Sequence, residues 1–280
     1  MIYRNQTFDQ ERALYGVQGV TLEACTFRGA ADGESALKES ADITVRHCVF
    51  ALRYPFWHTK GIRLEDSRTE EGCRAALWYC EDVDIRRTAL CGVKALRECQ
   101  SVRLERCTVS SAEFGWLSRG ITVIDSILSG EYAFLHAQNI TADRMQFSGK
   151  YSFQYTQNVT ITNSVLKTKD AFWHSKNVTV CDSVIEGEYL GWYAENLRLV
   201  RCHIKGTQPL CYARGLILED CTMEEADLAF EKSELFANIK GTVTSIKAPA
   251  KGSITADAIG DILPENDGTE GGAVITVLST

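Results

Sequence analysis

Long apolar segments are missing from this chain. No run approaches the ~20 apolar residues that a membrane-spanning helix needs, and the first residues, MIYRNQTFDQERALYG, lack the apolar centre of a secretory signal peptide. Only four prolines occur, and none interrupts the repeated motif described below at a fixed place. Together with eleven cysteines, these absences predict a protein of the reducing cytoplasm that has no membrane partner.

Clusters of basic residues are also missing. The chain has 30 Lys and Arg against 37 Asp and Glu, a net charge of −7, and its cations are scattered. Nucleic acid is therefore not expected as a partner, because no row of cations could neutralise its phosphates. The chain has no CxxC pair and no glycine-rich phosphate-binding loop, so no cofactor is expected.

A repeat of about nineteen residues fills most of the chain. Each repeat begins at an anchor, position 0, which is Gly, Asn, Asp or Ser. The anchors are Gly19, Asp42, Gly61, Asp82, Ser101, Gly120, Asn139, Asn158, Asn177, Asn196 and Gly215. The intervals 19–42 and 61–82 are longer than the others, which indicates small loop insertions in the early repeats.

The positions after each anchor follow a strand pattern. Positions 1 and 3 are nearly always Val, Ile or Leu, position 6 is small and position 8 is large and apolar, as in Val178, Val180, Ser183 and Ile185. Nineteen residues cannot hold a helix, a strand and two loops, so each repeat fits one coil stacked ~4.8 Å from the next. Parallel crossovers are overwhelmingly right-handed.

The repeat therefore predicts an all-β fold, a right-handed, single-stranded parallel β-helix of about eleven coils in residues 19–235. Residues 1–18 should form an N-terminal cap, and residues 236–280 a C-terminal cap and tail, in one domain overall. The caps are expected because an open coil end is an unpaired sheet edge.

Two segments carry a resemblance to known proteins: 172–177 (FWHSKN) and 191–196 (GWYAEN). The chain resembles the pectin-lyase-like superfamily of parallel β-helices, and more closely a family of bacterial β-helix proteins with FWHSKN and GWYSEN repeats and no assigned activity. The resemblance implies the fold. It implies no enzyme chemistry, because the polygalacturonase motifs Asn-Thr-Asp, Asp-Asp, Gly-His-Gly and Arg-Ile-Lys are missing.

Two ladders of side chains just before the anchors are candidates for a binding strip. Column −4, four residues before each anchor, holds every tryptophan: Lys38, Trp57, Trp78, Arg97, Trp116, Leu135, Gln154, Trp173, Trp192 and Cys211. Column −3 holds three of the five histidines: Glu39, His58, Tyr79, Glu98, Leu117, His136, Tyr155, His174, Tyr193 and Tyr212.

The flanking columns suggest which way these ladders face. Position −5 is always apolar or Gly and position −2 is always small and uncharged, so both should face the core. Columns −4 and −3 should then turn outward at a corner, since charges such as Lys38 and Glu39 are costly to bury. Aromatic faces could stack on sugars while His and Tyr bind hydroxyls. The competing interpretation is a packed or self-associating aromatic face.

The binding strip would consist of the aromatic and histidine members of both columns. They are Trp57, His58, Trp78, Tyr79, Trp116, His136, Tyr155, Trp173, His174, Trp192, Tyr193 and Tyr212.

Candidates for catalysis are few. Glu98, His174 and His58 are the available acid–base residues in the strip, but Glu39 and Glu98 would lie roughly 14 Å apart, beyond the 5–9.5 Å of glycosidase carboxylate pairs. Asp170 and Glu188 lie on adjacent coils and are interpreted as solvated surface charges.

No metal site is expected. His136 and His174 would be two coils, about 10 Å, apart, too far to share a zinc ion. Cysteines align on neighbouring coils, as Cys25 with Cys48 and Cys202 with Cys221, but parallel in-register side chains suit a disulfide torsion poorly. Free thiols that fill the core are the better interpretation.

The leading hypothesis is a non-enzymatic β-helix scaffold that binds carbohydrate or protein through the strip. Two alternatives remain open: a polysaccharide lyase or glycosidase with a non-standard site on the strip, and a purely structural rod that self-associates. The sequence determines neither the ligand nor the oligomeric state.

Overall fold

The computed structural model describes residues 1–29 and 33–278, and these residues fall into two compact units, Met1–Thr141 and Ala142–Thr280. Every regular element within those ranges is a β-strand. No helix in the described part of the chain is long and apolar enough to cross a membrane.

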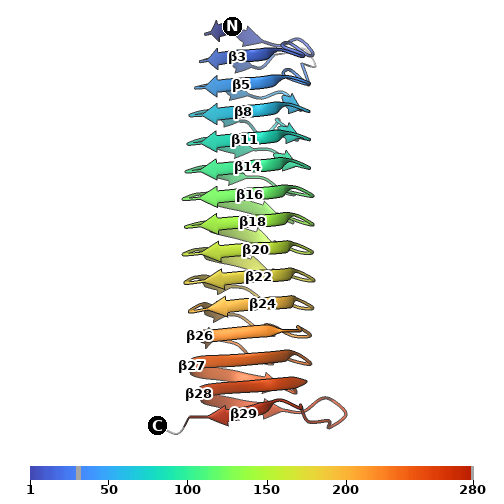
Figure 1. Ribbon diagram of the computed structural model, residues 1–280, viewed down its shortest axis with the longest axis vertical. Coiled ribbons are helices and arrows are strands. Elements are labelled where there is room, and N and C mark those ends of the chain that lie inside the picture. Colours follow the sequence, from blue (N-terminus) through green and yellow to red (C-terminus); the bar gives the residue numbers. More distant parts are fainter. Residues whose placement is uncertain (30–32, 279–280) are drawn as a thin grey trace. The chain divides into compact units, whose positions relative to one another are not determined.

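Unit 1 is built from parallel strands that recur once per coil. Its strands are β1 Ile2–Arg4, β2 Thr7–Phe8, β3 Gln18–Glu23, β4 Thr26–Phe27, β5 Ala41–Arg46, β6 Val49–Phe50, β7 Phe56–Trp57, β8 Lys60–Glu65, β9 Arg68–Thr69, β10 Leu77–Trp78, β11 Glu81–Arg86, β12 Ala89–Cys91, β13 Leu96–Arg97, β14 Gln100–Glu105, β15 Thr108–Ser110, β16 Arg119–Ile124 and β17 Ile127–Glu131, and β18 Gln138–Asp143 begins in it. The long strands β3, β5, β8, β11 and β14 lie side by side in register (Figure 1).

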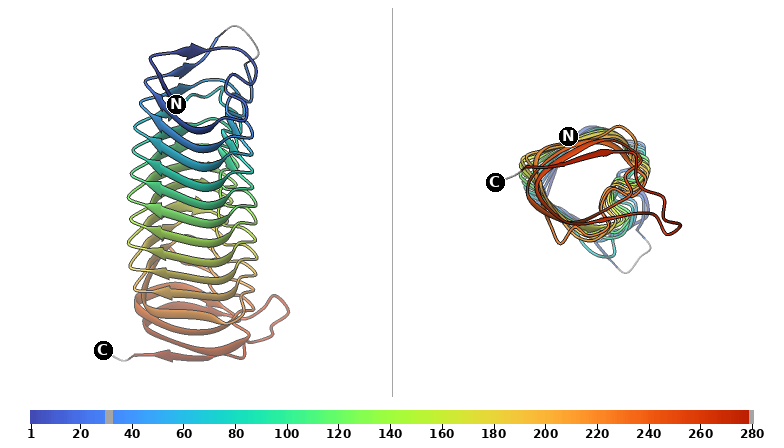
Figure 2. Two further views of the ribbon diagram at one scale, coloured as in Figure 1. Left: turned by 45° about the horizontal axis from the view of Figure 1, so that its top comes forward. Right: turned by 90° about the horizontal axis from the view of Figure 1, so that it is seen from below.

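Unit 2 repeats the same coil. Its strands are β19 Gln146–Lys150, β20 Gln157–Thr162, β21 Val165–Lys169, β22 Lys176–Cys181, β23 Val184–Glu186, β24 Glu195–Val200, β25 His203–Lys205, β26 Leu216–Glu224, β27 Glu234–Lys247, β28 Lys251–Leu263 and β29 Val274–Val277. Strands β20, β22, β24 and β26 pair in parallel, and the yellow and orange coils of Figure 2 follow one another turn by turn.

The predicted class of fold, an all-β parallel β-solenoid, is confirmed. The number of turns is about 14 rather than eleven. The difference arises at the two ends, where parallel pairing continues beyond the recognisable repeat: β1 pairs with β3, and β27, β28 and β29 pair in succession. The division of the chain into cap, repeats and tail stays a prediction.

Left-handed backbone makes the corners of each coil. In the coil around Asn177, φ is 51° at His174, 55° at Asn177 and 51° at Asp182, which are positions −3, 0 and 5. Gly and Asn adopt this conformation most readily. The anchors are therefore Gly, Asn or Asp, with Ser101 as the exception, because the chain turns there.

The core lies inside the coils and follows the predicted columns. For the ten anchors from Asp42 to Gly215, every residue at positions −5 and −2 is buried, as Phe172 and Ser175 illustrate. In unit 1 the rings of Phe8, Phe27 and Phe50 stack on one another with centroids 5.0 and 4.7 Å apart. Apart from the buried Cys211, the residues of columns −4 and −3 lie outside this interior, and none of the five tryptophans is fully buried.

Candidate functional site

Column −4 of unit 1 is a continuous stack of cations and indoles. The Lys38 Nζ lies 3.9 Å from the ring centroid of Trp57, and Trp57 stacks on Trp78 with centroids 5.1 Å apart. The Arg97 guanidinium lies 5.7 Å from Trp78 and 5.7 Å from Trp116. Such cations are attracted to the ring faces. Both faces of Trp57 and of Trp78 are therefore covered within the protein and cannot stack on a sugar.

Column −4 of unit 2 uses its indole N–H groups to join neighbouring coils. Trp173 and Trp192 are nearly parallel, with centroids 5.5 Å apart. Trp173 Nε1 donates to the carbonyl oxygen of Tyr189 at 2.9 Å, and Trp192 Nε1 donates to that of Gln208 at 2.7 Å. Each acceptor lies sixteen residues along, on the next coil. These tryptophans therefore satisfy backbone groups that the corner leaves unpaired.

The tryptophans of unit 1 follow this rule only in part. Trp116 Nε1 donates to the carbonyl of Tyr132, as in unit 2. Trp78 Nε1 donates instead to Glu98 Oε1 at 3.4 Å, and the buried Nε1 of Trp57 has no partner among the described residues. Stacking and hydrogen bonding account for most of column −4, which favours a structural role for its tryptophans.

Column −3 differs because its residues are exposed although their backbone is left-handed. All ten have φ between 51° and 58°, and all but Glu98 and Tyr212 are exposed. The other left-handed corners often carry Gly, Asn or Asp, as at Gly120 and Asp182, whereas none of these ten residues is of those types. A bulky residue in this conformation costs about 1–3 kcal/mol, and other left-handed corners of the coil carry the same cost, as at Phe172 and Tyr189. What distinguishes column −3 is that its bulky side chains are exposed.

In unit 1, hydrogen bonds engage Tyr79 and Glu98 of column −3. The rings of His58 and Tyr79 lie 5.0 Å apart, and the Tyr79 hydroxyl donates to Glu98, which raises the pKa of Tyr79. Glu98 also accepts from Arg97 Nε at 2.9 Å. Burial alone would raise the pKa of Glu98, but its donors Arg97, Tyr79 and Trp78 outweigh that effect and hold the pKa below its ordinary value. Glu98 is thus a firmly ionised carboxylate with its lone pairs in use.

The three candidates for catalysis are not brought together. Glu98, in unit 1, is a weak base because its pKa is lowered. His58 has no carboxylate within ion-pair distance among the described residues, and His174, in unit 2, lies between two tyrosine rings. No group of three or more His, Cys, Asp or Glu in residues 1–29 and 33–278 could hold a metal ion.

In unit 2, four rings of column −3 form one stack. The centroids of Tyr155 and His174 are 5.1 Å apart, those of His174 and Tyr193 are 4.9 Å apart, and those of Tyr193 and Tyr212 are 5.0 Å apart. The planes deviate by 10°, 6° and 13°. Faces inside the stack are covered by other rings, so these residues present only their edges, which carry imidazole nitrogens and hydroxyls. His136, the remaining histidine of the column, is exposed in unit 1.

The stack ends at Tyr212, beside an open hollow of about 390 Å³. The unit-2 hollow is lined by His174, Tyr193, Ala194, Glu195, Tyr212, Arg214 and Lys232. Tyr193 covers one face of Tyr212, and Trp192, on the same coil as Tyr193, meets Tyr212 in a T-shaped contact. No ring or cation stacks on Tyr212 from the next coil among the described residues. The hollow thus combines one open ring face with the polar edges of His174 and Tyr193.

A buried ion pair fixes Tyr212. Burial, together with the nearby charge of Glu231 and the hydrogen bond that the tyrosine donates to it, raises the pKa of Tyr212 to about 12. Glu231 is in turn paired with Lys247, whose Nζ lies 3.0 Å from Oε1. Tyr212 therefore stays a neutral phenol at physiological pH. It is held in place for binding and is poorly suited to act as a base.

The expectation that Asp170 is a solvated surface charge is wrong. Its side chain is buried, with 5% of the residue exposed, and burial raises its pKa. Glu188, the other member of that predicted pair, is exposed and bound to Lys169 at 2.8 Å. The two carboxylates thus differ in environment, although the charge of Glu188 also contributes to the raised pKa of Asp170.

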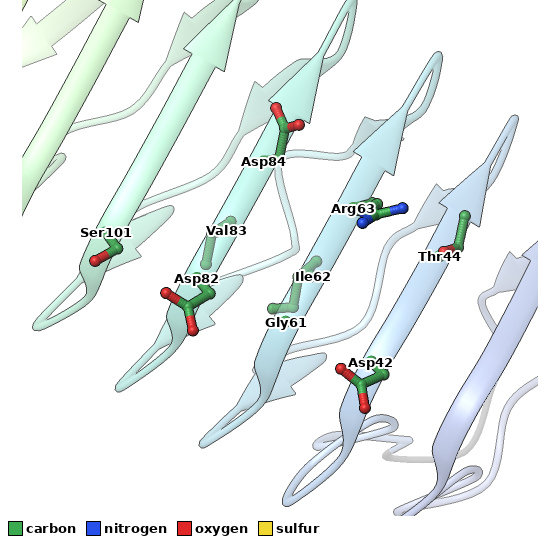
Figure 3. Close-up of a pocket in the computed structure, with 9 residues that line it drawn as sticks. All are labelled: Asp42, Thr44, Gly61, Ile62, Arg63, Asp82, Val83, Asp84 and Ser101. Carbon is green, nitrogen blue, oxygen red and sulfur yellow. The ribbon is translucent and has the colours of Figure 1, made fainter.

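A second hollow, in unit 1, lies on the outer face of β5, β8 and β11 (Figure 3). Its volume is about 510 Å³, and Asp42, Gly61 and Asp82 line it along one row of anchors. The space exists because Gly61, with φ of 68°, has no side chain between its two acidic neighbours. This hollow has no aromatic residue and lies away from columns −4 and −3. It reflects the requirement for Gly, Asn or Asp at the corner.

Sequence patterns identified His174, Tyr193 and Tyr212 but missed Arg214, Glu231 and Lys232. The repeat shifts here: the pairing of β26 with β27 is irregular between Leu218 and Cys221. Lys232 has the left-handed φ of 54° that marks column −3, and the neighbouring Ser233 accepts from the N–H of Ala213, which lies at position −2. A coil lengthened by one residue was the available signal, since twenty residues rather than nineteen separate Ala213 from Ser233.

Several solved structures are distantly similar to this chain. The crystal structure of PfbA, a surface adhesin of Streptococcus pneumoniae, aligns over 98% of this chain and 83% of that one, with 8% identity and a TM-score of 0.33. The A-module of the mannuronan C-5 epimerase AlgE4 of Azotobacter vinelandii aligns over 99% and 89%, with 11% identity and a TM-score of 0.32.

The catalytic domain of a GH87 alpha-1,3-glucanase in complex with nigerose aligns over all of this chain and 64% of its own length, with 6% identity and a TM-score of 0.33. At these values the likenesses carry no argument about function. No curated protein matches the chain. One family model matches residues 1–276, which is nearly the whole chain, and the protein therefore belongs to the family described as "Protein of unknown function (DUF3737)".

Proposed function

We propose that this protein is a non-enzymatic solenoid scaffold that binds carbohydrate at the unit-2 hollow. The observation that carries the proposal is the end of the ring stack. There the open face of Tyr212 adjoins the polar edges of His174 and Tyr193 in one hollow of about 390 Å³.

The chemistry of these groups suits a sugar. The apolar face of a sugar ring packs on an aromatic face, and its hydroxyls need donors and acceptors close by. Neither the imidazole nitrogens of His174 nor the hydroxyl of Tyr193 is hydrogen-bonded to any other described residue, so both are available. Tyr193 is 42% exposed, which keeps its edge within reach of a ligand.

The ring spacing favours an extended chain over a compact ligand. Edges of Tyr155, His174 and Tyr193 recur about every 5 Å along the coils, and the hollow is open. A glycan lying along column −3 could meet several edges in turn. Membership of the pectin-lyase-like superfamily, which the repeats resemble, is also part of this proposal.

A glycan array with the purified protein tests the proposal. Tyr212→Leu removes the ring face, and the matched variant Tyr212→Phe keeps the face while losing the bond to Glu231. Binding should fall about tenfold in Tyr212→Leu, roughly the value of one aromatic contact, and should persist in Tyr212→Phe. Thermal unfolding of both variants checks that the fold is intact.

Three results would contradict the proposal. Equal binding by wild type and a correctly folded Tyr212→Leu would exclude the hollow as the site. Release of new reducing ends or unsaturated products, abolished by His174→Ala, would favour the polysaccharide-active enzyme. No bound glycan, with a sedimentation coefficient that rises with concentration, would favour the self-associating rod.

A further inference from the structure

Arg214 is a cation that the ladder of charges leaves without a partner. It occupies the position just before the anchor Gly215, and the coils on either side place Glu195 and Glu234 at the corresponding points. Glu195 is already bound to Lys176, whose Nζ lies 3.1 Å from Oε2. No described residue forms an ion pair or a side-chain hydrogen bond with Arg214.

This absence is unusual for unit 2, where exposed charges generally pair between coils. Lys167 binds Glu186 at 3.1 Å, and Arg201 binds Asp182 at 2.6 Å. Arg214 has Glu195 and Glu234 at the matching positions of the neighbouring coils, yet it pairs with neither and lines the unit-2 hollow.

Lys232 adds a second cationic group to the same hollow. Its only ion pair among the described residues is with Glu265, at 3.6 Å, which is longer than a hydrogen bond. Glu195, the one carboxylate that lines the hollow, is neutralised by Lys176. The hollow is thus locally positive in a chain whose net charge is −7.

We propose that Arg214, assisted by Lys232, binds an oxyanion on the sugar that stacks on Tyr212, so that the natural ligand is an acidic glycan. This inference rests on the proposed function and specifies its ligand class. The planar guanidinium donates two parallel hydrogen bonds to a carboxylate, sulfate or phosphate group, which a neutral hydroxyl cannot match. The acidic chain as a whole repels such ligands, so selectivity must come from these contacts.

The test compares neutral oligosaccharides with carboxylated, sulfated and phosphorylated forms of the same backbones. Affinity is measured by calorimetry for wild type, Arg214→Gln and the control Arg198→Gln, which removes an exposed cation of unit 2 that is bound to Glu219. Arg214→Gln should weaken binding of the acidic forms about tenfold, equivalent to about 1.4 kcal/mol, and leave the neutral forms unchanged. Raising the salt concentration should weaken the acidic ligands selectively.

The three acidic arms show which oxyanion is bound. Equal affinity of wild type and Arg214→Gln for every acidic form would overturn the inference, as would neutral forms that bind as tightly as their acidic counterparts. If binding of neutral forms still depended on Tyr212, the carbohydrate proposal would stand without the acidic ligand. Failure of every oligosaccharide to bind wild type would overturn both proposals.

Discussion

Left-handed corners explain most of the residue preferences of this repeat. Gly, Asn and Asp at the anchors suit a positive φ, but Tyr and His in column −3 do not. In unit 2 the stacking of rings offsets this strain, because each aromatic pair contributes about 0.5–1.5 kcal/mol beyond its buried area. The two effects are of similar size, so column −3 adds little to net stability.

Tyr193→Asn tests that balance. The change relieves left-handed strain and removes two stacked ring contacts and one T-shaped contact with Trp192, so the free energy of unfolding should change by less than about 2 kcal/mol. Gly120→Ala is the calibrating variant: φ there is 67° and a Cβ would have only ordinary contacts, so its loss of about 1 kcal/mol measures the strain alone. Urea denaturation measures both. A loss above 4 kcal/mol in Tyr193→Asn would show that the column exists for stability.

The tryptophans of column −4, unlike Tyr193, should contribute clearly to the free energy of unfolding. Trp173→Phe leaves the Tyr189 carbonyl without its donor, which should cost about 1–3 kcal/mol of unfolding free energy. Trp57→Phe removes an N–H that has no partner, so its cost should be smaller. Equal losses in chemical denaturation would refute the structural role given to the indole N–H.

The raised pKa of the buried Asp170 should make the stability of the protein depend on pH. Because burial raises its folded-state pKa, the unfolded chain loses the proton first as pH rises above about 3.8. The native state then binds more protons, so this residue lowers stability as pH rises through its folded-state pKa. Asp170→Asn should therefore unfold at a higher temperature than wild type at pH 7. This advantage should disappear below pH 3.8, and an advantage that grew in acid would contradict the assignment.

Among the elements, the small residues at position 6 prove to be hydrogen-bond acceptors. The N–H of Cys107 donates to Ser126 Oγ at 3.0 Å, and that of Cys25 donates to Cys48 Sγ at 3.3 Å. Each acceptor lies on the next coil and serves an N–H that follows a left-handed corner. Size alone suggested core filling, and the cysteines are indeed free thiols, most of them buried. The sequence did not reveal the acceptor role, because Cys, Ser and Thr all fill it and their shared small size suggested only core filling.

Ser126→Ala should be costly for this reason. It leaves the buried Cys107 N–H without an acceptor, at about 1–3 kcal/mol, whereas Ser126→Cys should cost less because a thiol fills the same role at Cys48. Denaturation gives the difference, and hydrogen exchange at the Cys107 amide should accelerate only in the alanine variant. Equal stability of the two variants would refute the acceptor role.

For the molecule as a whole, periodicity predicted the fold because every coil repeats the same steric requirements. The outward turn of columns −4 and −3 was also predictable from the small or apolar residues that flank them. The hollow was not, because it depends on a break in the period: a coil lengthened by one residue places Lys232 in column −3 and Glu231 beside Tyr212. The sequence also could not show which of the two columns has polar groups available to a ligand. That depends on the stacking and hydrogen bonding of the side chains, which residue types alone do not reveal.

The central claim is that column −3 of unit 2 binds a ligand while column −4 supports the fold. Its most direct test measures glycan affinity and unfolding free energy together in Tyr193→Phe and Trp192→Phe. The account predicts that Tyr193→Phe weakens binding about tenfold with stability within ~0.5 kcal/mol of wild type, and that Trp192→Phe loses about 1–3 kcal/mol of stability with unchanged affinity. The reverse pattern, with binding lost at Trp192 and stability lost at Tyr193, would contradict it.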